Sequence, residues 1–164
     1  MKRQDKINYY LDIAEAVAHR STCLRKWYGC VIVKNDEIVS TGYSGAPRGR
    51  PNCCDLNFCS KKEKFPDVRH AGYEACRSVH SEQNAIISAS RERMIGSSLY
   101  LVGVRADKPS VYEEGAKPCL LCERLIINAG IKTVFVRKNK EEYIEIPVEN
   151  MINNDPVLKG KLSY

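Results

Sequence analysis

His80-Ser81-Glu82 and, further along, Pro118-Cys119-Leu120-Leu121-Cys122 are the two stretches that decide the fold of this chain. The first offers an imidazole and a carboxylate two residues apart, and the second offers two sulfurs three residues apart. The imidazole and both sulfurs can fill three positions of a tetrahedral zinc site and leave the fourth open. An open position indicates catalysis, whereas four protein ligands would indicate a structural metal.

Helical and strand patterns alternate around these two stretches. Apolar spacing predicts helices, and runs rich in β-formers predict strands, of which the first two form a hairpin. The predicted helices cover residues 7–18, 80–93, 119–129 and 147–151, and the predicted strands cover 28–33, 37–43, 99–104, 131–137 and 143–146. Such alternation indicates a layered α/β fold, and 164 residues suit one domain over 1–164.

Two segments lack any clear period, residues 44–79 and residues 102–117. A long irregular segment inside a compact domain is usually functional, or is held by something other than an apolar core. We expect the second segment to border the site.

Composition narrows the class of protein. With 43% hydrophobic and 28% charged residues, the chain reads as a globular protein, and no run approaches the roughly 20 apolar residues of a membrane span. We see no signal peptide and expect a cytoplasmic location without a membrane partner. The net charge of +6 suits an anionic partner such as a nucleotide phosphate or RNA, although a solvated surface explains it equally well.

The spacing of the ligands points to a specific chemistry. His-x-Glu combined with Pro-Cys-x-x-Cys is the pattern of zinc deaminases, so His80, Cys119 and Cys122 are the expected ligands. Zinc makes hydroxide available near neutral pH, and Glu82 is the expected catalytic proton shuttle while hydroxide attacks the amine-bearing ring carbon. The Cys-x-x-Cys pair alone could instead be a redox pair or half of a structural zinc knuckle.

Four stretches resemble the deoxycytidylate (dCMP) deaminase family, within the cytidine deaminase superfamily, and the resemblance covers about residues 5 to 140. They are Arg20-Ser21-Thr22-Cys23, Gly42-Tyr43-Ser44-Gly45-Ala46-Pro47-Arg48-Gly49, His80 to Ile86, and Pro118 to Cys122 followed by Ile126 to Lys132. The resemblance implies a three-layer α/β/α sandwich with a central five-stranded mixed sheet, and hydrolysis of dCMP to dUMP and ammonia. It also implies a homo-oligomer, commonly a hexamer, with dCTP and dTTP as effectors.

Four further residues are candidates for substrate binding. Ser44 stands where the family usually has an asparagine that helps hold the nucleotide, and Tyr112 lies in an interval that is longer than the family's. Asn84 lies one helical turn after His80 and is either a satisfied polar residue or a contact behind the metal ligands. Arg48 could meet a phosphate or simply face solvent.

The remaining cysteines raise the prospect of a second, structural zinc that would hold the irregular segment 44–79 together. The family resemblance favours Cys23, Cys53, His70 and Cys76 as its ligands. Cys54 and Cys59 could replace members of this set, or several of these cysteines could be free thiols. Cys30 falls in a strand pattern and fits a small core residue better.

Two rival functions stay open. The same zinc chemistry could act on cytidine, a free base, a pterin or pyrimidine intermediate, or adenosine in tRNA. A rival of a different class is a zinc-stabilised nucleic-acid-binding module without turnover. Glu82 favours an enzyme, because a binding module needs no carboxylate beside an open metal position, and nucleic acid is therefore not the expected partner.

Overall fold

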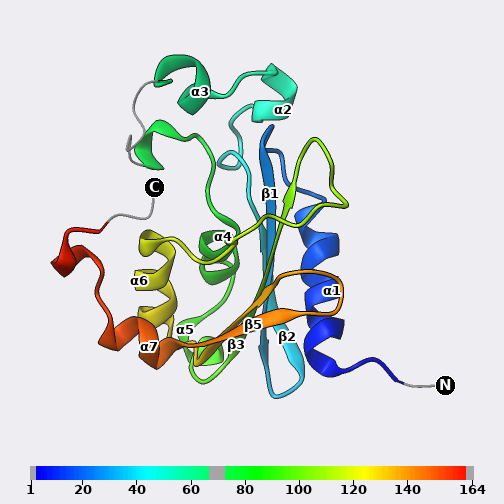
Figure 1. Cartoon of the computed structure of the whole chain (residues 1–164), viewed down its shortest axis with the longest axis vertical. Coiled ribbons are helices and arrows are strands. Elements are labelled where there is room, and N and C mark those ends of the chain that lie inside the picture. Colours follow the sequence, from blue (N-terminus) through cyan, green and yellow to red (C-terminus); the bar gives the residue numbers. More distant parts are fainter. Residues whose placement is uncertain (1–2, 67–72, 162–164) are drawn as a thin grey trace.

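The computed structural model describes residues 3–66 and 73–161, and its centre is a five-stranded mixed sheet (Figure 1). The strand order is β2-β1-β3-β4-β5. Only the β3–β4 pair is parallel, and the other three pairs are antiparallel. The strands are β1 (Lys26–Lys34), β2 (Glu37–Tyr43), β3 (Ser98–Arg105), β4 (Thr133–Arg137) and β5 (Tyr143–Pro147).

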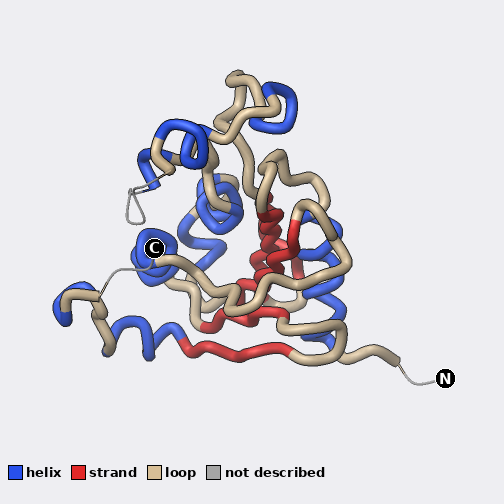
Figure 2. Tube along the Cα trace, turned by 45° about the horizontal axis from the view of Figure 1, so that its top comes forward, coloured by secondary structure: helices blue, strands red, loops and turns tan. Residues whose placement is uncertain are grey.

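Helices cover both faces of this sheet (Figures 1 and 2). Helix α1 (Lys6–Ala18) packs on one face, while α4 (Ser81–Ile87) and α6 (Leu120–Ala129) lie on the other. The shorter helices are α2 (Cys53–Leu56), α3 (Ser60–Lys64), α5 (Arg91–Met94) and α7 (Val148–Asn153), with single 3-10 turns at η1 (Tyr73–Ala75) and η2 (Val157–Lys159). The expected three-layer α/β/α fold is therefore confirmed.

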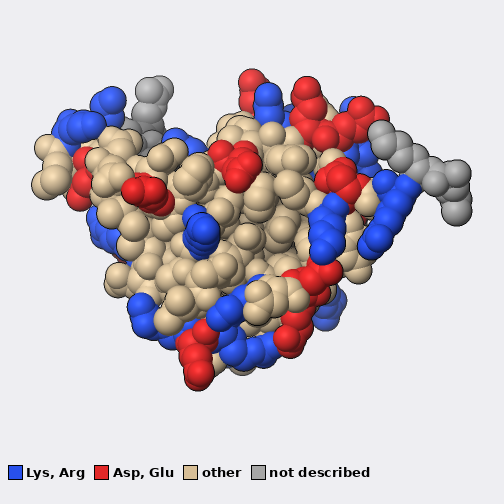
Figure 3. All heavy atoms as spheres, turned by 90° about the horizontal axis from the view of Figure 1, so that it is seen from below, with Lys and Arg blue, Asp and Glu red and all other residues tan. Residues whose placement is uncertain are grey.

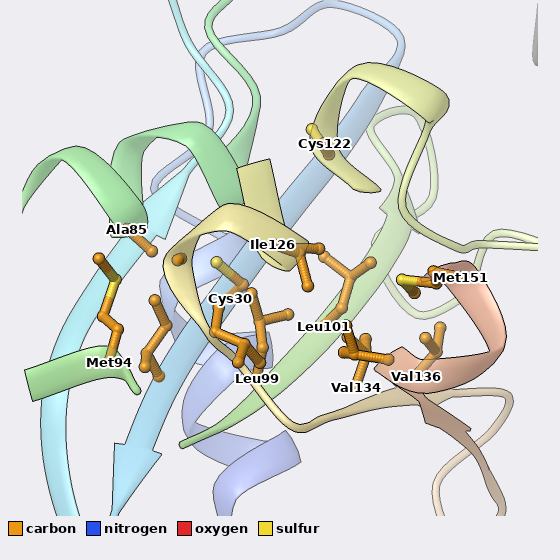
Figure 4. Packing of buried hydrophobic residues seen from close by; sticks show 14 of the residues in the cluster. Cys30, Ala85, Met94, Leu99, Leu101, Cys122, Ile126, Val134, Val136 and Met151 are labelled. Atoms are coloured by element: carbon orange, nitrogen blue, oxygen red, sulfur yellow. The ribbon is translucent and has the colours of Figure 1, made fainter. Parts of the chain in front are cut away.

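Each face of the sheet has its own apolar core. Val31 and Val33 of β1 face α1, whereas Cys30 and Ile32 face α4 and α6, as the two-residue period of a strand requires. Figure 4 shows the second core, in which Ile126 of α6 points onto the sheet. Strands that are buried on both sides read as continuous apolar runs, which is why β1 and β3 were recognisable.

The single helix predicted over residues 80–93 is wrong, because the structure breaks it in two. Helix α4 ends at Ile87, where the Ser88 hydroxyl donates a hydrogen bond to the Asn84 carbonyl, and Ser90 is extended before α5. Serine side chains compete with the backbone for such hydrogen bonds and favour helix ends. The predicted start of the later helix is also one residue early, since Cys119 is extended and α6 begins at Leu120.

Isolated β-bridges anchor the two segments that were predicted to be irregular, residues 44–79 and 102–117. Residues 44–79 contain α2, α3 and η1, and a bridge between Gly45 and Val79 closes their base. The segment after β3 is tied to that strand by a bridge between Val104 and Tyr112. Among the described residues, no helix is long and apolar enough to cross a membrane.

Candidate metal centre and pocket

His80, Cys119 and Cys122 meet where two helices begin. His80 is the residue before α4, Cys119 is the residue before α6, and Cys122 lies in the first turn of α6. The His80 Nδ1 atom lies 3.5 Å from the Cys119 Sγ and 3.4 Å from the Cys122 Sγ. Within residues 3–66 and 73–161, these three form the one group of metal-binding side chains whose ligand atoms all lie within 4.8 Å.

The spacing of these atoms fits zinc. With Zn–N of about 2.1 Å and Zn–S of about 2.3 Å, a tetrahedral ion separates nitrogen from sulfur by about 3.6 Å. Both observed nitrogen–sulfur distances are close to that value. One nitrogen and two sulfurs are also the donor types that zinc prefers, and they leave one of four positions open.

The pKa values of the two cysteines shift in opposite directions. The Cys122 thiol donates a hydrogen bond that lowers the pKa of Cys119, and His80 lowers that pKa further. The same hydrogen bond raises the pKa of Cys122. A site that already holds one sulfur as a thiolate is prepared for a cation, because the thiolate is the form that ligates metal.

Glu82 is buried beside these ligands, with only 4% of its surface exposed. Burial raises the pKa of its carboxyl group. The fully buried Ser81 hydroxyl donates a hydrogen bond of 2.8 Å to the Glu82 Oε2 atom. A carboxylate with a raised pKa and a fixed orientation is suited to exchange protons near neutral pH.

Packing fixes the helix that carries His80 and Glu82. A side chain at Gly42 of β2 would overlap the Ser81 carbonyl and the Ala85 amide, so only glycine allows α4 to approach this closely. The Tyr73 ring meets the His80 ring edge to face, with 4.6 Å between centroids. Both contacts limit the movement of the imidazole.

The centre opens into a pocket of about 390 Å³. Four cationic side chains contribute to its wall, namely Arg25, Lys26, Lys61 and Lys117. Lys26 forms an ion pair with Glu113 from the segment after β3, and the Lys61 ammonium lies 5.4 Å from the centre of the Tyr73 ring. The pocket therefore combines a buried acid at its metal end with several positive charges.

The four predicted substrate-binding residues occupy different places. Ser44 lines the pocket, but its hydroxyl is shared with Ser21 and accepts a hydrogen bond from the Tyr28 amide. The Asn84 amide donates to the Tyr43 carbonyl, which is the satisfied polar alternative, and Arg48 is exposed outside the pocket wall.

Tyr112 does not join the pocket wall, although its segment reaches the pocket through Lys117. The Tyr112 hydroxyl donates to Glu15 of α1, on the opposite face of the sheet. The position of Tyr112 therefore does not support the predicted role of this residue in substrate binding.

The predicted second zinc cluster is only partly described. Cys23 and Cys76 line the pocket together with Cys59, and Cys53 is buried nearby with an Arg77 nitrogen 3.8 Å from its sulfur. His70 lies outside the described residues. The second zinc therefore stays a prediction.

Sequence reasoning missed several residues of the pocket. Ser81 lies inside the motif but was assigned no role, and Tyr28, Lys61 and Lys117 were not proposed as site residues. The two-residue period of β1 could have indicated Tyr28, since it places that residue on the same face as Cys30. Nothing local predicts Lys61, because the irregular segment brings it to the pocket.

Comparisons with known proteins agree with this centre. The family described as "Cytidine and deoxycytidylate deaminase zinc-binding region" matches residues 4–138. The deoxycytidylate deaminase of Mycobacterium phage D29 is 35% identical over 140 residues, which are 84% of this chain and 98% of the relative. That of Schizosaccharomyces pombe is 33% identical over 132 residues, and the match spans 77% of this chain but 35% of the yeast protein.

A known structure shares the arrangement of elements. The dCMP deaminase of cyanophage S-TIM5 in complex with dCMP and dUMP superposes with a TM-score of 0.57 at 26% identity, covering 84% of each chain. The match to the family spans both ligand stretches and the carboxylate between them. The chain is therefore a zinc-dependent hydrolase and belongs to the cytidine and deoxycytidylate deaminase family.

Proposed function

We propose that the chain hydrolyses dCMP to dUMP and ammonia at the pocket beside His80, Cys119 and Cys122. The observation that carries the proposal is Glu82, a carboxyl group that is almost fully buried next to three zinc-type ligands. Burying a carboxyl group costs free energy, and acids with such perturbed surroundings gather at sites of proton transfer. Hydrolysis requires such proton transfer.

The proton transfers define what Glu82 does. When bound, the zinc ion would supply a water molecule activated for attack near neutral pH, because zinc lowers the pKa of that water toward about 7. Glu82 accepts a proton from the attacking water and delivers it to ring nitrogen N3 of the pyrimidine. Glu82 then takes the proton of the new C4 hydroxyl and hands it to the departing amine as the C4 carbonyl forms, so that one water is consumed and one ammonia is released.

Ser81 and the helix start keep this carboxylate oriented. The Ser81 hydroxyl fixes one carboxylate oxygen, and α4 is held against β2 at Gly42. The positions of the groups that exchange protons are thus set before substrate arrives, which avoids reorganisation during the reaction.

The charge of the pocket favours a nucleotide over a free nucleoside. Positive charge on the wall comes from Arg25, Lys26, Lys61 and Lys117, against the acid Glu113 that pairs with Lys26. A 5′-phosphate carries the negative charge that such a group of cations attracts. The names of the relatives, deoxycytidylate deaminases, support the same substrate.

Replacing Glu82 tests the proposal. Glu82→Gln keeps the size of the side chain and leaves all three zinc ligands in place, so zinc content should be unchanged. Ammonia release from dCMP should fall by about 10²- to 10⁴-fold, the usual contribution of general acid–base catalysis. Glu123→Gln is the matched control, because Glu123 lies in the first turn of α6 but outside the wall of this pocket.

A substrate screen makes the test complete. Ammonia release should be fastest with dCMP among dCMP, CMP, dCTP, cytidine, guanine and an adenosine-containing tRNA. Near-normal turnover by Glu82→Gln would remove the role assigned to Glu82. Faster turnover of any other compound would replace dCMP as the substrate.

Three finer expectations accompany this proposal. A homo-oligomer, response to dCTP and dTTP, and a second zinc at Cys23, Cys53, His70 and Cys76 all follow from the family resemblance. Sedimentation, kinetics with each effector, and metal analysis of the purified protein address them in turn. Two zinc ions per chain would support the second cluster, and one would remove it.

A further inference from the structure

Alternate residues of β1 lead from the buried core into the wall of the pocket. Cys30, Tyr28 and Lys26 lie two residues apart, so their side chains leave the same face of the strand. Cys30 is fully buried, and burial together with the negative charge of Glu82 raises the pKa of its thiol. Tyr28 and Lys26 both line the pocket. This row thus leads from a buried residue near Glu82 to Lys26, which pairs with Glu113.

A glycine on the neighbouring strand fixes the Tyr28 ring. Tyr28 pairs with Gly103 across the β1–β3 ladder. A Cβ atom at position 103 would lie only 2.5 Å from the Tyr28 Cε1 and 3.0 Å from its Cδ1 and Cζ. The Tyr28 ring therefore fills the space that a side chain at position 103 would take, an arrangement in which an aromatic side chain covers a gap in the sheet.

The hydroxyl of Tyr28 has no hydrogen-bond partner among residues 3–66 and 73–161. It is not one of the fully buried polar atoms in these ranges that lack a partner. Burial raises the pKa of Tyr28, and the negative charges of Glu113 and Glu82 raise it further. The group is consequently a neutral phenol that can donate a hydrogen bond into the pocket.

We propose that Tyr28 contacts the substrate at the level of the pentose, with its ring packed against the sugar and its hydroxyl donating to a substrate oxygen. Four residues of strand separate Cys30 from Lys26, about 13 Å at roughly 3.3 Å per residue. A base deaminated beside Glu82 and a phosphate held by the cations of the pocket wall place the sugar between them, and Tyr28 lines the same pocket. This inference rests on the proposed function, because it assumes a nucleotide in the pocket.

Two substitutions separate the hydroxyl from the ring. Tyr28→Phe removes only the donor, so KM for dCMP and the inhibition constant of dUMP should each rise about 3- to 10-fold, with kcat changed less than about 2-fold. Tyr28→Val also removes the ring and should raise both constants further. Tyr100→Phe is the matched control, since Tyr100 is a buried tyrosine on the α1 face of the sheet.

Zinc content and Tm distinguish substrate contact from a structural role. Both should be unchanged in Tyr28→Phe, and a loss of either that accounts for the rise in KM would overturn the inference. It is also overturned if Tyr28→Phe keeps KM and the dUMP inhibition constant within about 2-fold of the parent. If the parent releases no ammonia from dCMP, the proposed function fails instead, and dUMP binding still tests Tyr28.

Discussion

Ser81 is the residue on which the orientation of Glu82 depends most directly. It is fully buried, and its hydroxyl is the side-chain donor to the Glu82 carboxylate. Ser81→Ala should leave zinc bound but lower kcat about 10-fold, because a buried carboxylate oxygen loses its donor. Steady-state kinetics and metal analysis of the same sample measure both effects.

Ser97→Ala provides the control for this substitution. Ser97 is equally buried, but its hydroxyl has no hydrogen-bond partner in the described part of the chain. Its removal should therefore leave kcat unchanged. Equal effects of the two alanine variants would mean that Ser81 contributes only packing.

Residues whose chemistry is encoded by local spacing could be predicted from the sequence. His80 and Glu82 are two residues apart, and the two cysteines are three residues apart. The structure brings the three predicted ligands together. Tyr112 could not be placed in this way, since its partner Glu15 lies 97 residues away. A contact of that range leaves no trace in the local pattern of a single sequence.

Two glycines set how closely helices approach the central strands. Gly42 of β2 faces α4, and Gly29 of β1 faces α1, and a side chain at either position would overlap helix backbone. Gly42→Ala and Gly29→Ala should each lower the free energy of unfolding by about 1–3 kcal/mol, since backbone must shift to relieve the overlap. Denaturant titration measures this loss.

Zinc binding should separate these two variants. Displacing α4 moves His80 away from the sulfurs, whereas displacing α1 moves a helix that carries no ligand. Zinc affinity should therefore fall in Gly42→Ala and stay near the parent value in Gly29→Ala. A similar loss of zinc in both variants would show that the centre depends on global stability alone.

Helices and strands whose apolar residues recur at regular spacing could be predicted, and those without such spacing could not. The helix predicted over residues 7–18 matches α1 closely because its apolar stripe repeats over three turns. The break between α4 and α5 was missed because the apolar spacing continues across Ser88 and Ser90. Helices α2 and α3 are only four and five residues long, too short to show a helical period.

Charged side chains of both signs share one face of the molecule. On the face shown in Figure 3, basic and acidic side chains are interspersed around the edge and the middle is mostly uncharged. The net charge of +6 therefore did not indicate the site by itself. The informative cations are the few at the pocket, and only the fold brings Arg25, Lys61 and Lys117 together.

The metal centre joins parts of the chain that are far apart in sequence. His80 and Cys122 are 42 residues apart, and they connect the starts of α4 and α6 on one face of the sheet. A ligand that binds only the folded state stabilises it by about 4 kcal/mol at a thousandfold excess over its Kd. Removal of zinc with a chelator should therefore lower Tm by roughly 10 °C.

The variant that lacks a ligand shows whether the chelator acts through this centre. Cys119→Ala should unfold at a lower temperature than the parent with zinc present, and chelator should change its Tm far less. Differential scanning calorimetry with and without chelator gives both values, and restoring zinc should recover the parent Tm only. A metal ion that binds only the folded state raises Tm, so its removal must lower Tm. If Tm of the parent does not change with chelator, the three ligands do not hold α4 and α6 together through a metal ion.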